Sequence, residues 1–416
     1  MDIDLLITNA QVVTCKGLAP KIGKQLLDIG VIEEGAIACR DGKIVWVGKT
    51  DETPPEMRQA RSLINAAGKV VMPGFVDPHT HLVFGGSRED EYALKLQGVS
   101  YLEILKQGGG ILSTVEKTRY IVQEDLYMLA RSRVDEMLAS GTTTIEVKSG
   151  YGLDILNENK ILRVAGMLQG YKGVDVVPTF LGAHAWPKNI THEEYMEALQ
   201  IEISLVHQHK LAEFCDVFCE EGAFSLEEAR RILECAKACS MKLKIHAGEM
   251  SDLRGGELAA ELGVTSLDHG EHISDDQIEM LARRRIPIVL MPGVNFHLMT
   301  QPAPARKFIE MGVPVALATD FNPGSSPVLS MQFIIQLACR MYRMSYEEAI
   351  NAATINAACA IDRADIVGSI EAGKQADLLI LDIPTYKQLP YWIGRNCVET
   401  VIKRGKIVYQ KSYDKP

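Results

Sequence analysis

The feature that most constrains the fold is a regular alternation of short apolar runs with longer amphipathic stretches between residues 67 and 363. The helical patterns of 123–140 and 226–240 separate successive runs, each of which has the length of a buried strand. Eight β/α units over roughly 250 residues are typical of a (β/α)8 barrel. The eight expected strands are 69–75, 141–147, 174–180, 214–219, 241–245, 264–267, 286–291 and 313–318.

A doubly wound parallel sheet is the alternative fold for such an alternation. That fold commonly binds nucleotides through a glycine-rich loop that follows a strand directly. No loop of that kind follows any of the eight runs. The α/β pattern therefore favours the barrel.

Both ends of the chain have a different sequence pattern, in which short strand-like runs are separated by turns. The N-terminal part includes an Asp41-Gly42 turn signal between two such runs, and the C-terminal part repeats the pattern over 376–409. Because the two ends match, we expect residues 1–66 and 364–416 to form one small β-sandwich domain. Residues 67–363 would form the barrel.

Composition narrows the class of protein. The net charge of -10 argues against a nucleic-acid or anionic-membrane partner. No apolar run reaches the ~18 residues of a membrane helix, and Met1–Asp4 lacks the basic region of a signal peptide. Nine cysteines, an odd number, suit a reducing compartment better than a disulfide framework. We expect a cytoplasmic globular protein.

Histidines gather where the predicted strands end, the face on which barrels of this kind carry their active sites. His79 and His81 follow the first strand at positions i and i+2, so both side chains point to the same side of an extended segment. One divalent metal ion can therefore be held by both imidazoles. Two histidines in a polar turn can equally be surface residues, so the assignment depends on further ligands.

A mononuclear metal site needs three or four nitrogen or oxygen ligands and an open position for water. The candidate ligands at the strand ends are His79, His81, His246 and Asp320. The metal would lower the pKa of its water toward about 7 and polarise a carbonyl, and Asp320 could take the proton of that water. His269 and Glu249 are candidates for an acid or a base. No cysteine lies beside these residues, which disfavours a thiolate site.

The loop after the first strand also carries Arg88, whose guanidinium suits a carboxylate-bearing substrate. Tyr151 and His184, in the loops after the second and third strands, add neutral hydrogen-bonding groups. The alternative for Arg88 is a surface salt bridge with one of the acidic residues 89–91. The residues alone predict a small-molecule hydrolase.

Several segments resemble the amidohydrolase superfamily. Residues 73–81, Pro-Gly-Phe-Val-Asp-Pro-His-Thr-His, are similar to the signature of its first strand. More specifically, segments 84–88, 107–111, 146–154 and 318–325 resemble members that open the ring of 4-imidazolone-5-propanoate to N-formimidoyl-L-glutamate in histidine degradation. The resemblance spans essentially the whole chain, including the β-domain of both termini.

The resemblance implies a role for each matching position. It places one zinc or iron ion per chain on His79, His81, His246 and Asp320. It places contacts to the imidazolone ring on Arg88, Tyr151, His184 and Glu249. It assigns the product end to Asn322, Gly324 and Ser325, and the propionate to Arg88 helped by Tyr101. A homodimer is also implied. Binuclear relatives carry a bridging lysine on the fourth strand, and its absence from residues 217–220 indicates a single metal.

Two alternatives and one departure accompany this prediction. The chain could be another cyclic amidohydrolase or aminohydrolase with the same mononuclear site. It could also be an inactive scaffold, but such relatives typically lose ligands that this chain keeps. The departure is Ala247-Gly248-Glu249, where the family more often has an acidic residue before the glutamate. Gly248 should loosen this loop and leaves the division of proton transfer between Glu249 and His269 open.

Overall fold

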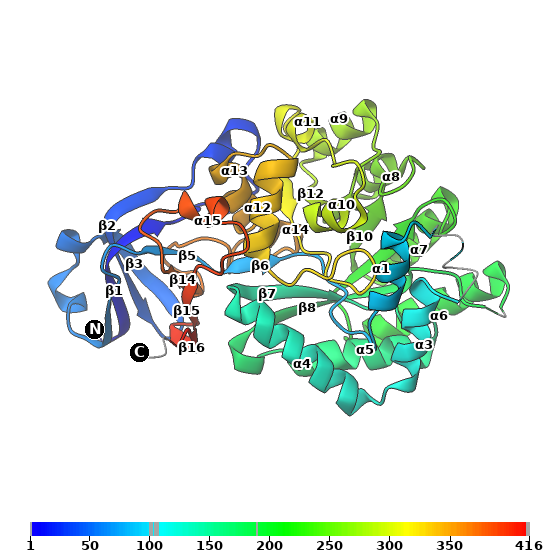
Figure 1. Cartoon of the computed structure of the whole chain (residues 1–416), viewed down its shortest axis with the longest axis horizontal. Helices are drawn as coiled ribbons and strands as arrows, with labels where there is room; N and C mark the ends of the chain where they lie inside the picture. The colour runs from blue at the N-terminus through cyan, green and yellow to red at the C-terminus, as the bar shows by residue number, and fades with distance from the viewer. Residues whose placement is uncertain (1, 100–102, 104–107, 189, 413–416) are drawn as a thin grey trace.

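Two sheets of eight strands organise the chain, one made by the termini and one by the middle (Figure 1). The computed structural model describes residues 2–99, 103, 108–188 and 190–412. In this part of the chain, no helix combines the length and the apolar character needed to cross a bilayer. The predicted barrel and the predicted β-domain of both termini are confirmed.

The middle sheet contains eight strands in sequence order, and every neighbouring pair is parallel. The strands are β6 (Phe75–Asp77), β7 (Thr142–Lys148), β8 (Asp175–Ala183), β9 (Phe214–Cys219), β10 (Lys242–Ala247), β11 (Ser266–His269), β12 (Ile288–Leu290) and β13 (Val315–Leu317). All seven residues of β7 are buried, as expected for a parallel strand that is covered on both faces.

The first and last barrel strands meet through the segments that follow them. A parallel bridge joins Thr80 to Phe321, and the amide of Asp320 donates to the carbonyl of His79 at 3.0 Å. Beneath this contact the buried Asp77 carboxylate accepts from the Thr319 amide at 3.1 Å and from the Thr319 hydroxyl at 2.6 Å. The closure therefore brings the two histidines after β6 beside Asp320.

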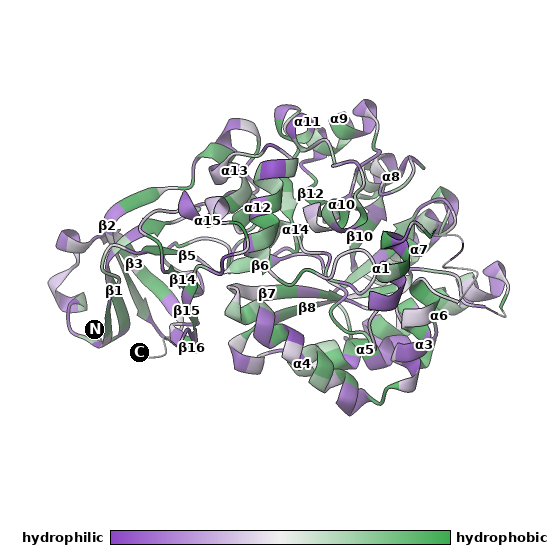
Figure 2. Ribbon diagram, viewed as in Figure 1, coloured by the Kyte–Doolittle hydropathy of each residue, from purple (hydrophilic) through white to green (hydrophobic). Residues whose placement is uncertain are grey.

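Helices surround the barrel and follow its strands. They are α1 (Glu89–Leu96), α3 (Ile111–Tyr120), α4 (Gln123–Ala139), α5 (Ile155–Leu168), α6 (His192–Gln208), α7 (Leu226–Ala238), α8 (Gly255–Leu262), α9 (Asp275–Arg284), α10 (Pro292–Leu298), α11 (Ala305–Glu310), α12 (Met331–Met341), α13 (Tyr346–Ala352), α14 (Ile355–Ala360) and α15 (Gln388–Tyr391). Reciprocal capping boxes begin α6 at Thr191, α7 at Ser225 and α13 at Ser345. In Figure 2 the strands are mostly green and the outer surfaces of the helices carry the purple, hydrophilic residues.

The terminal sheet has the order β16-β15-β14-β5-β1-β2-β3, with β4 also paired to β1. Its strands are β1 (Ile3–Val13), β2 (Val31–Arg40), β3 (Lys43–Lys49), β4 (Ala60–Asn65), β5 (Val70–Pro73), β14 (Leu378–Leu381), β15 (Val398–Lys403) and β16 (Lys406–Gln410). The antiparallel pair β5–β14 joins the two ends of the chain into one sheet.

The first predicted strand differs from the structure in one respect. The apolar run 69–75 is divided at Gly74: β5 pairs with β1 and β14 of the terminal sheet, and only β6 belongs to the barrel. A side chain at Gly74 would lie 2.3 Å from the Thr143 hydroxyl, so the chain can pass between the two sheets only at a glycine. The expected boundary at residue 67 therefore moves to about this glycine.

We predict that the Thr319–Asp77 contact contributes measurably to stability. Thr319→Val removes a hydroxyl donor from a buried carboxylate and should lower the free energy of unfolding by about 1–3 kcal/mol. Thr142→Val is the matched control, because the buried Thr142 hydroxyl has no hydrogen-bond partner among the described residues. Thermal unfolding midpoints measure both variants, and equal midpoints would contradict the prediction.

Candidate active site

The two histidines after β6 form the centre of the site. Nε2 of His79 and Nε2 of His81 lie 3.4 Å apart, and both side chains are buried. The amide of His81 donates to the carbonyl of Phe321 at 2.9 Å, which fixes the backbone of this loop against the segment after β13. The predicted orientation of both imidazoles toward one point is confirmed.

Asp320, directly after β13, points at the same pair. Its Oδ1 lies 3.3 Å from His79 Nε2 and 3.5 Å from His81 Nε2. The backbone of Asp320 is left-handed, with φ of 49°, a conformation that costs free energy for a non-glycine residue. Nδ2 of the Asn322 side chain donates to the carbonyl of Asp320 at 2.7 Å and to its Oδ2 at 3.0 Å, which supports this conformation.

His246, at the end of β10, lies beside His79, with ring centroids 4.4 Å apart. The ligating atoms of His79, His246 and His269 lie within 4.8 Å of one another, as do those of His79, His81 and Asp320. Nε2 of His246 is buried and has no hydrogen-bond partner among the described residues. A buried nitrogen without a partner fits a metal ligand, since the ion would satisfy it.

The protonation of the imidazoles suits metal binding. Burial and the nearby ammonium of Lys148 hold the pKa of His79 well below its usual value. Burial and the neighbouring His184 and His246 do the same for the pKa of His81. Burial raises the pKa of Asp320 to about 8, so a cation beside it would favour the ionised form. Neutral imidazoles and a carboxylate are the donors that a divalent metal accepts.

A layer of charged side chains lies beneath the histidines inside the barrel. The Lys148 ammonium is 2.7 Å from Asp216, 2.9 Å from Glu146 and 3.2 Å from Asp268. The Lys244 ammonium is 3.3 Å from Glu146 and 3.4 Å from Asp268. All five side chains are fully buried. We call these residues the charge layer.

The charge layer contacts two of the candidate ligands directly. Asp268 Oδ2 is 2.7 Å from His79 Nδ1, and Asp216 Oδ2 is 3.0 Å from His246 Nδ1. The Asp268 carboxylate, hydrogen-bonded to Nδ1 of His79, fixes the orientation of that ring and directs its Nε2 toward the proposed metal position. Asp216 lies at ion-pair distance from Nδ1 of His246 without the geometry of a hydrogen bond. Burial opposes ionisation of both carboxyls, but Lys244 and Lys148 hold the pKa of Asp268 below its usual value, and His246 and Lys148 do so for Asp216.

Glu146, Asp216 and Lys244 have no role predicted from the sequence. These residues lie inside apolar strands, where a charged side chain reads as an interruption of the pattern. Glu146 and Lys148 are two residues apart on β7 and therefore share one face of the strand. That spacing, with further charges inside β9 and β10, was the signal that could have revealed an inward-facing charged layer.

His269 and Glu249 form a second titratable pair beside the histidines. His269 Nε2 lies 3.7 Å from Glu249 Oε2. Burial alone would lower the pKa of His269, but the carboxylates of Glu249, Glu271 and Asp320 raise it to about 9. The imidazolium form of His269 is therefore favoured at neutral pH, which makes it a proton donor in this geometry.

The residues expected to bind the substrate lie around this centre. The ring of His184 stacks on His81 with centroids 4.9 Å apart, and the ring of Tyr151 lies 5.5 Å from that of His184. The buried carboxylate of Glu158 accepts the amides of Gly150, Gly152 and Leu153 and so holds the loop that carries Tyr151. Tyr101 lies outside the described residues.

Arg88 forms an ion pair with Glu91 at 2.9 Å, one of the alternatives considered from the sequence. It also reaches the loop after β13, because a Cβ atom at Gly324 would lie 2.1 Å from Arg88 Nη1. The glycine therefore makes room for the guanidinium. Asn322 Oδ1 accepts the amides of Gly324 and Ser325 at 2.8 Å, so this loop is ordered by its own side chain.

Comparison with known proteins places these observations in a family. The profile of the Amidohydrolase family matches residues 70–408. A protein of Clostridium tetani named imidazolonepropionase is 48% identical over 415 residues, with 99% of each chain covered. One of Geobacillus kaustophilus with the same name is 48% identical, with 96% of each chain covered.

Solved structures share the fold at lower identity. Guanine deaminase of E. coli has a TM-score of 0.71 at 17% identity and covers 99% of each chain. An adenosine deaminase of Xanthomonas campestris, solved with bound zinc, has a TM-score of 0.71 at 21% identity and covers 98% of this chain and 93% of its own. This likeness concerns the fold alone.

We predict that Lys148 is needed for metal retention. Lys148→Met leaves three buried carboxylates with one ammonium and should lower the free energy of unfolding by about 3–5 kcal/mol and release metal from the dialysed protein. The double variant Lys148→Met/Glu146→Gln removes one charge of each sign and should recover part of both losses.

Metal per chain, measured by elemental analysis, and the unfolding midpoint report on the two effects. The half-exposed Lys172, paired with Asp135, provides the control variant Lys172→Met. A Lys148→Met protein that matches this control in metal content and midpoint would refute the role of the charge layer.

Proposed function

The chain belongs to the amidohydrolase family, and on this premise we propose that it hydrolyses the ring C–N bond of 4-imidazolone-5-propanoate to N-formimidoyl-L-glutamate in histidine degradation. Its relatives over nearly the full length carry the name imidazolonepropionase. Within the structure, the main support is that His79 belongs to two clusters of possible ligands, one with His81 and Asp320 and one with His246 and His269, at the end of the barrel where Arg88 also lies.

The proposed cofactor is one zinc or iron ion per chain, held by these three histidines and Asp320. Nitrogen and oxygen donors accept either ion. Two further groups of possible ligands exist in the charge layer, around Asp268. The ammonium groups of Lys148 and Lys244 already lie 3.2 and 3.4 Å from that carboxylate. Internal cations thus take the positions where a second ion would bind, which supports a single metal.

When bound, the metal supplies an activated water and polarises the ring carbonyl. Asp320 Oδ2 is proposed to accept the proton of the attacking water. The imidazolium of His269, beside Glu249, is proposed to donate a proton to the ring nitrogen as the C–N bond breaks. The ring opens into a single product: the carbonyl carbon becomes a carboxylic acid that ionises and releases its remaining proton to solvent, and the nitrogen becomes the imino nitrogen of the formimidoyl group. Return of the proton held by Asp320 to His269 would restore both residues.

Arg88 is proposed to bind the propionate, and Tyr151, His184 and Glu249 to contact the ring. The ion pair of Arg88 with the Glu91 carboxylate is the same kind of contact as the one proposed with the propionate. A substrate carboxylate would share the guanidinium with Glu91, because an arginine offers five N–H donors. Asn322, Gly324 and Ser325 are proposed to surround the product.

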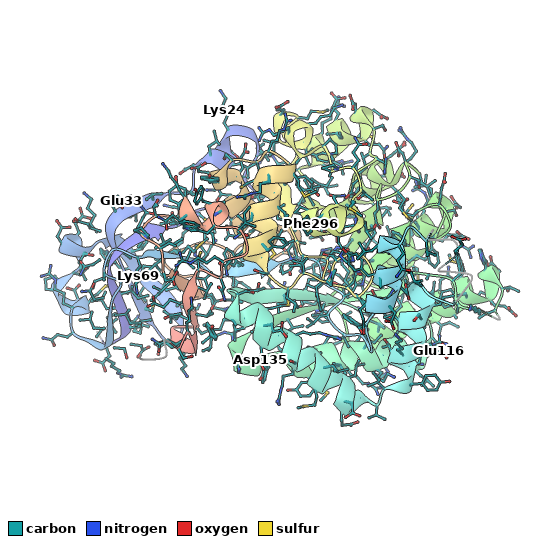
Figure 3. All side chains as sticks on the ribbon, viewed as in Figure 1. Lys24, Glu33, Lys69, Glu116, Asp135 and Phe296 are labelled. Atoms are coloured by element: carbon teal, nitrogen blue, oxygen red, sulfur yellow. The ribbon has the colours of Figure 1, made fainter. Side chains whose placement is uncertain are left out.

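Two properties of the whole molecule belong to the same proposal. All nine cysteines are free thiols, which supports a reducing compartment such as the cytoplasm. A homodimer is proposed because large apolar side chains are exposed on and after α10 and α15, which both pack against α12. Phe296 is 52% exposed (Figure 3), and Trp392 and Ile393 are 43% and 62% exposed.

The function is tested by turnover of imidazolonepropionate, generated enzymatically and followed by its absorbance. Metal-dependent loss of the signal is the expected result. Hydantoins, dihydropyrimidines and aminopurines are assayed in parallel, because faster turnover of one of these would assign the same site to another cyclic amidohydrolase or aminohydrolase. No metal-dependent turnover of imidazolonepropionate would overturn the proposal.

Within the same assay, Arg88→Met should keep its metal and raise KM by roughly 10- to 100-fold, the loss of about 1.5–3 kcal/mol from a charge-assisted contact. Arg254→Met is the control, since Arg254 pairs with surface carboxylates near α8. An unchanged KM for Arg88→Met would mean that another group binds the carboxylate.

A further inference from the structure

The loop that carries Glu249 is held by a carboxylate from the neighbouring strand. Glu220 follows β9 directly and is 1% exposed. Its Oε1 accepts the amide of Glu249 at 2.6 Å and that of Met250 at 3.3 Å. Its Oε2 accepts the amide of Ser251 at 2.9 Å and the Ser251 hydroxyl at 2.6 Å. One side chain thus binds three consecutive residues of the loop.

This arrangement answers the question raised by Gly248. Gly248 has a φ of +72°, and a Cβ atom there would lie 2.8 Å from Ile273 Cγ1. The glycine therefore allows the loop to lie close against the segment after β11. In that segment, the His272 amide donates to the Gly248 carbonyl at 2.8 Å. The loop is held by the segment after β11 on one side and by Glu220 on the other, and these contacts oppose the looseness expected from Gly248.

The Glu220 contacts determine where Glu249 can reach. The side chain of Glu249 is 19% exposed, and its Oε2 stands 3.7 Å from His269 Nε2. Residues 248–254 precede α8 and belong to no helix or strand, so no regular element holds their backbone. A buried carboxylate that accepts several amides fixes the backbone more firmly than solvent would. The position of the Glu249 carboxylate therefore depends on Glu220.

A buried glutamate also holds the loop that carries Tyr151. There the buried Glu158 accepts the amides of Gly150 at 2.8 Å, Gly152 at 2.6 Å and Leu153 at 2.8 Å. Two loops at this end of the barrel are thus each held by one buried glutamate that does not itself reach the histidines. The recurrence indicates that such carboxylates order the site, and Glu220 is the one next to a titratable group.

We propose that Glu220 is a positioning residue, which holds Glu249 against His269 by binding the amides of residues 249–251. This inference rests on the proposed role of Glu249 and His269 in proton transfer. An amide in place of the carboxylate presents one oxygen and one NH2 group. Glu220→Gln can therefore accept only part of the four hydrogen bonds and places N–H groups against N–H donors.

A double-mutant cycle with Glu249 separates positioning from a general structural role. Glu220→Gln should lower kcat by about 100-fold, because small misplacements of a reacting group have effects of this size. In a Glu249→Gln background the same change should lower kcat less than about 3-fold, since the carboxylate that Glu220 positions is already gone. Equal fold-losses in both backgrounds would overturn the proposal.

Hydrogen–deuterium exchange of the metal-loaded protein gives a readout that does not require turnover. The amides of residues 249–251 should exchange at least about 10-fold faster in Glu220→Gln, while the amides of β10 stay protected. Glu221→Gln is the matched control, because Glu221 is the adjacent, exposed glutamate. Exchange at the control rate in Glu220→Gln would contradict the proposal even if the enzyme acts on another substrate.

A milder variant covers the case in which Glu220→Gln does not fold. Ser251→Ala removes one of the four hydrogen bonds to Glu220, the 2.6 Å contact from the Ser251 hydroxyl, together with the 3.2 Å hydrogen bond that this hydroxyl accepts from the Glu221 amide. It should speed exchange of the 249–251 amides and lower kcat in the same direction but by a smaller factor, about 3- to 10-fold. Metal content should stay at the level of the unmodified protein in every variant, and wild-type exchange and kcat in Ser251→Ala would count against the role of Glu220.

Discussion

The charge layer inside the barrel is the constraint on which the rest of the site depends. Three carboxylates and two ammonium groups are fully buried together, where isolated charges would be very costly. Two of those carboxylates lie against the Nδ1 atoms of His79 and His246. The orientation of the His79 imidazole is therefore set by a buried carboxylate of the charge layer, and the His246 imidazole lies at ion-pair distance from another.

Two other sets of contacts hold the remaining residues of the candidate site. The closure between β6 and β13 brings Asp320 to the histidine pair, through Thr319 and Asp77. Buried glutamates then hold the loops that present Tyr151 and Glu249. The proposed metal ligands, proton donor and substrate contacts follow several different strands, and buried carboxylates contact His79, His246 and the loops of Tyr151 and Glu249. Functional side chains on several different loops suit a fold in which the loops vary while the barrel stays constant.

Much of the barrel and of the candidate metal site could be predicted from the sequence, for a physical reason. His79, His81, His246 and Asp320 all follow apolar runs, and parallel strands bring their carboxyl ends to one face of a barrel. The division at Gly74 could not be predicted, because β5 and β6 form one apolar run and differ only in which sheet they join. Glu220 was equally hidden, since its role depends on backbone amides of a loop about 30 residues away.

The central claim is that a single metal in the histidine–aspartate cage is required for hydrolysis of the imidazolone ring. Its most direct test is to strip the protein of metal, titrate zinc or iron back, and follow turnover of imidazolonepropionate at each ratio of metal to chain. The account predicts no turnover without metal and activity that rises to a plateau at one ion per chain. Full turnover by the metal-free protein, or a plateau at two ions per chain, would contradict it.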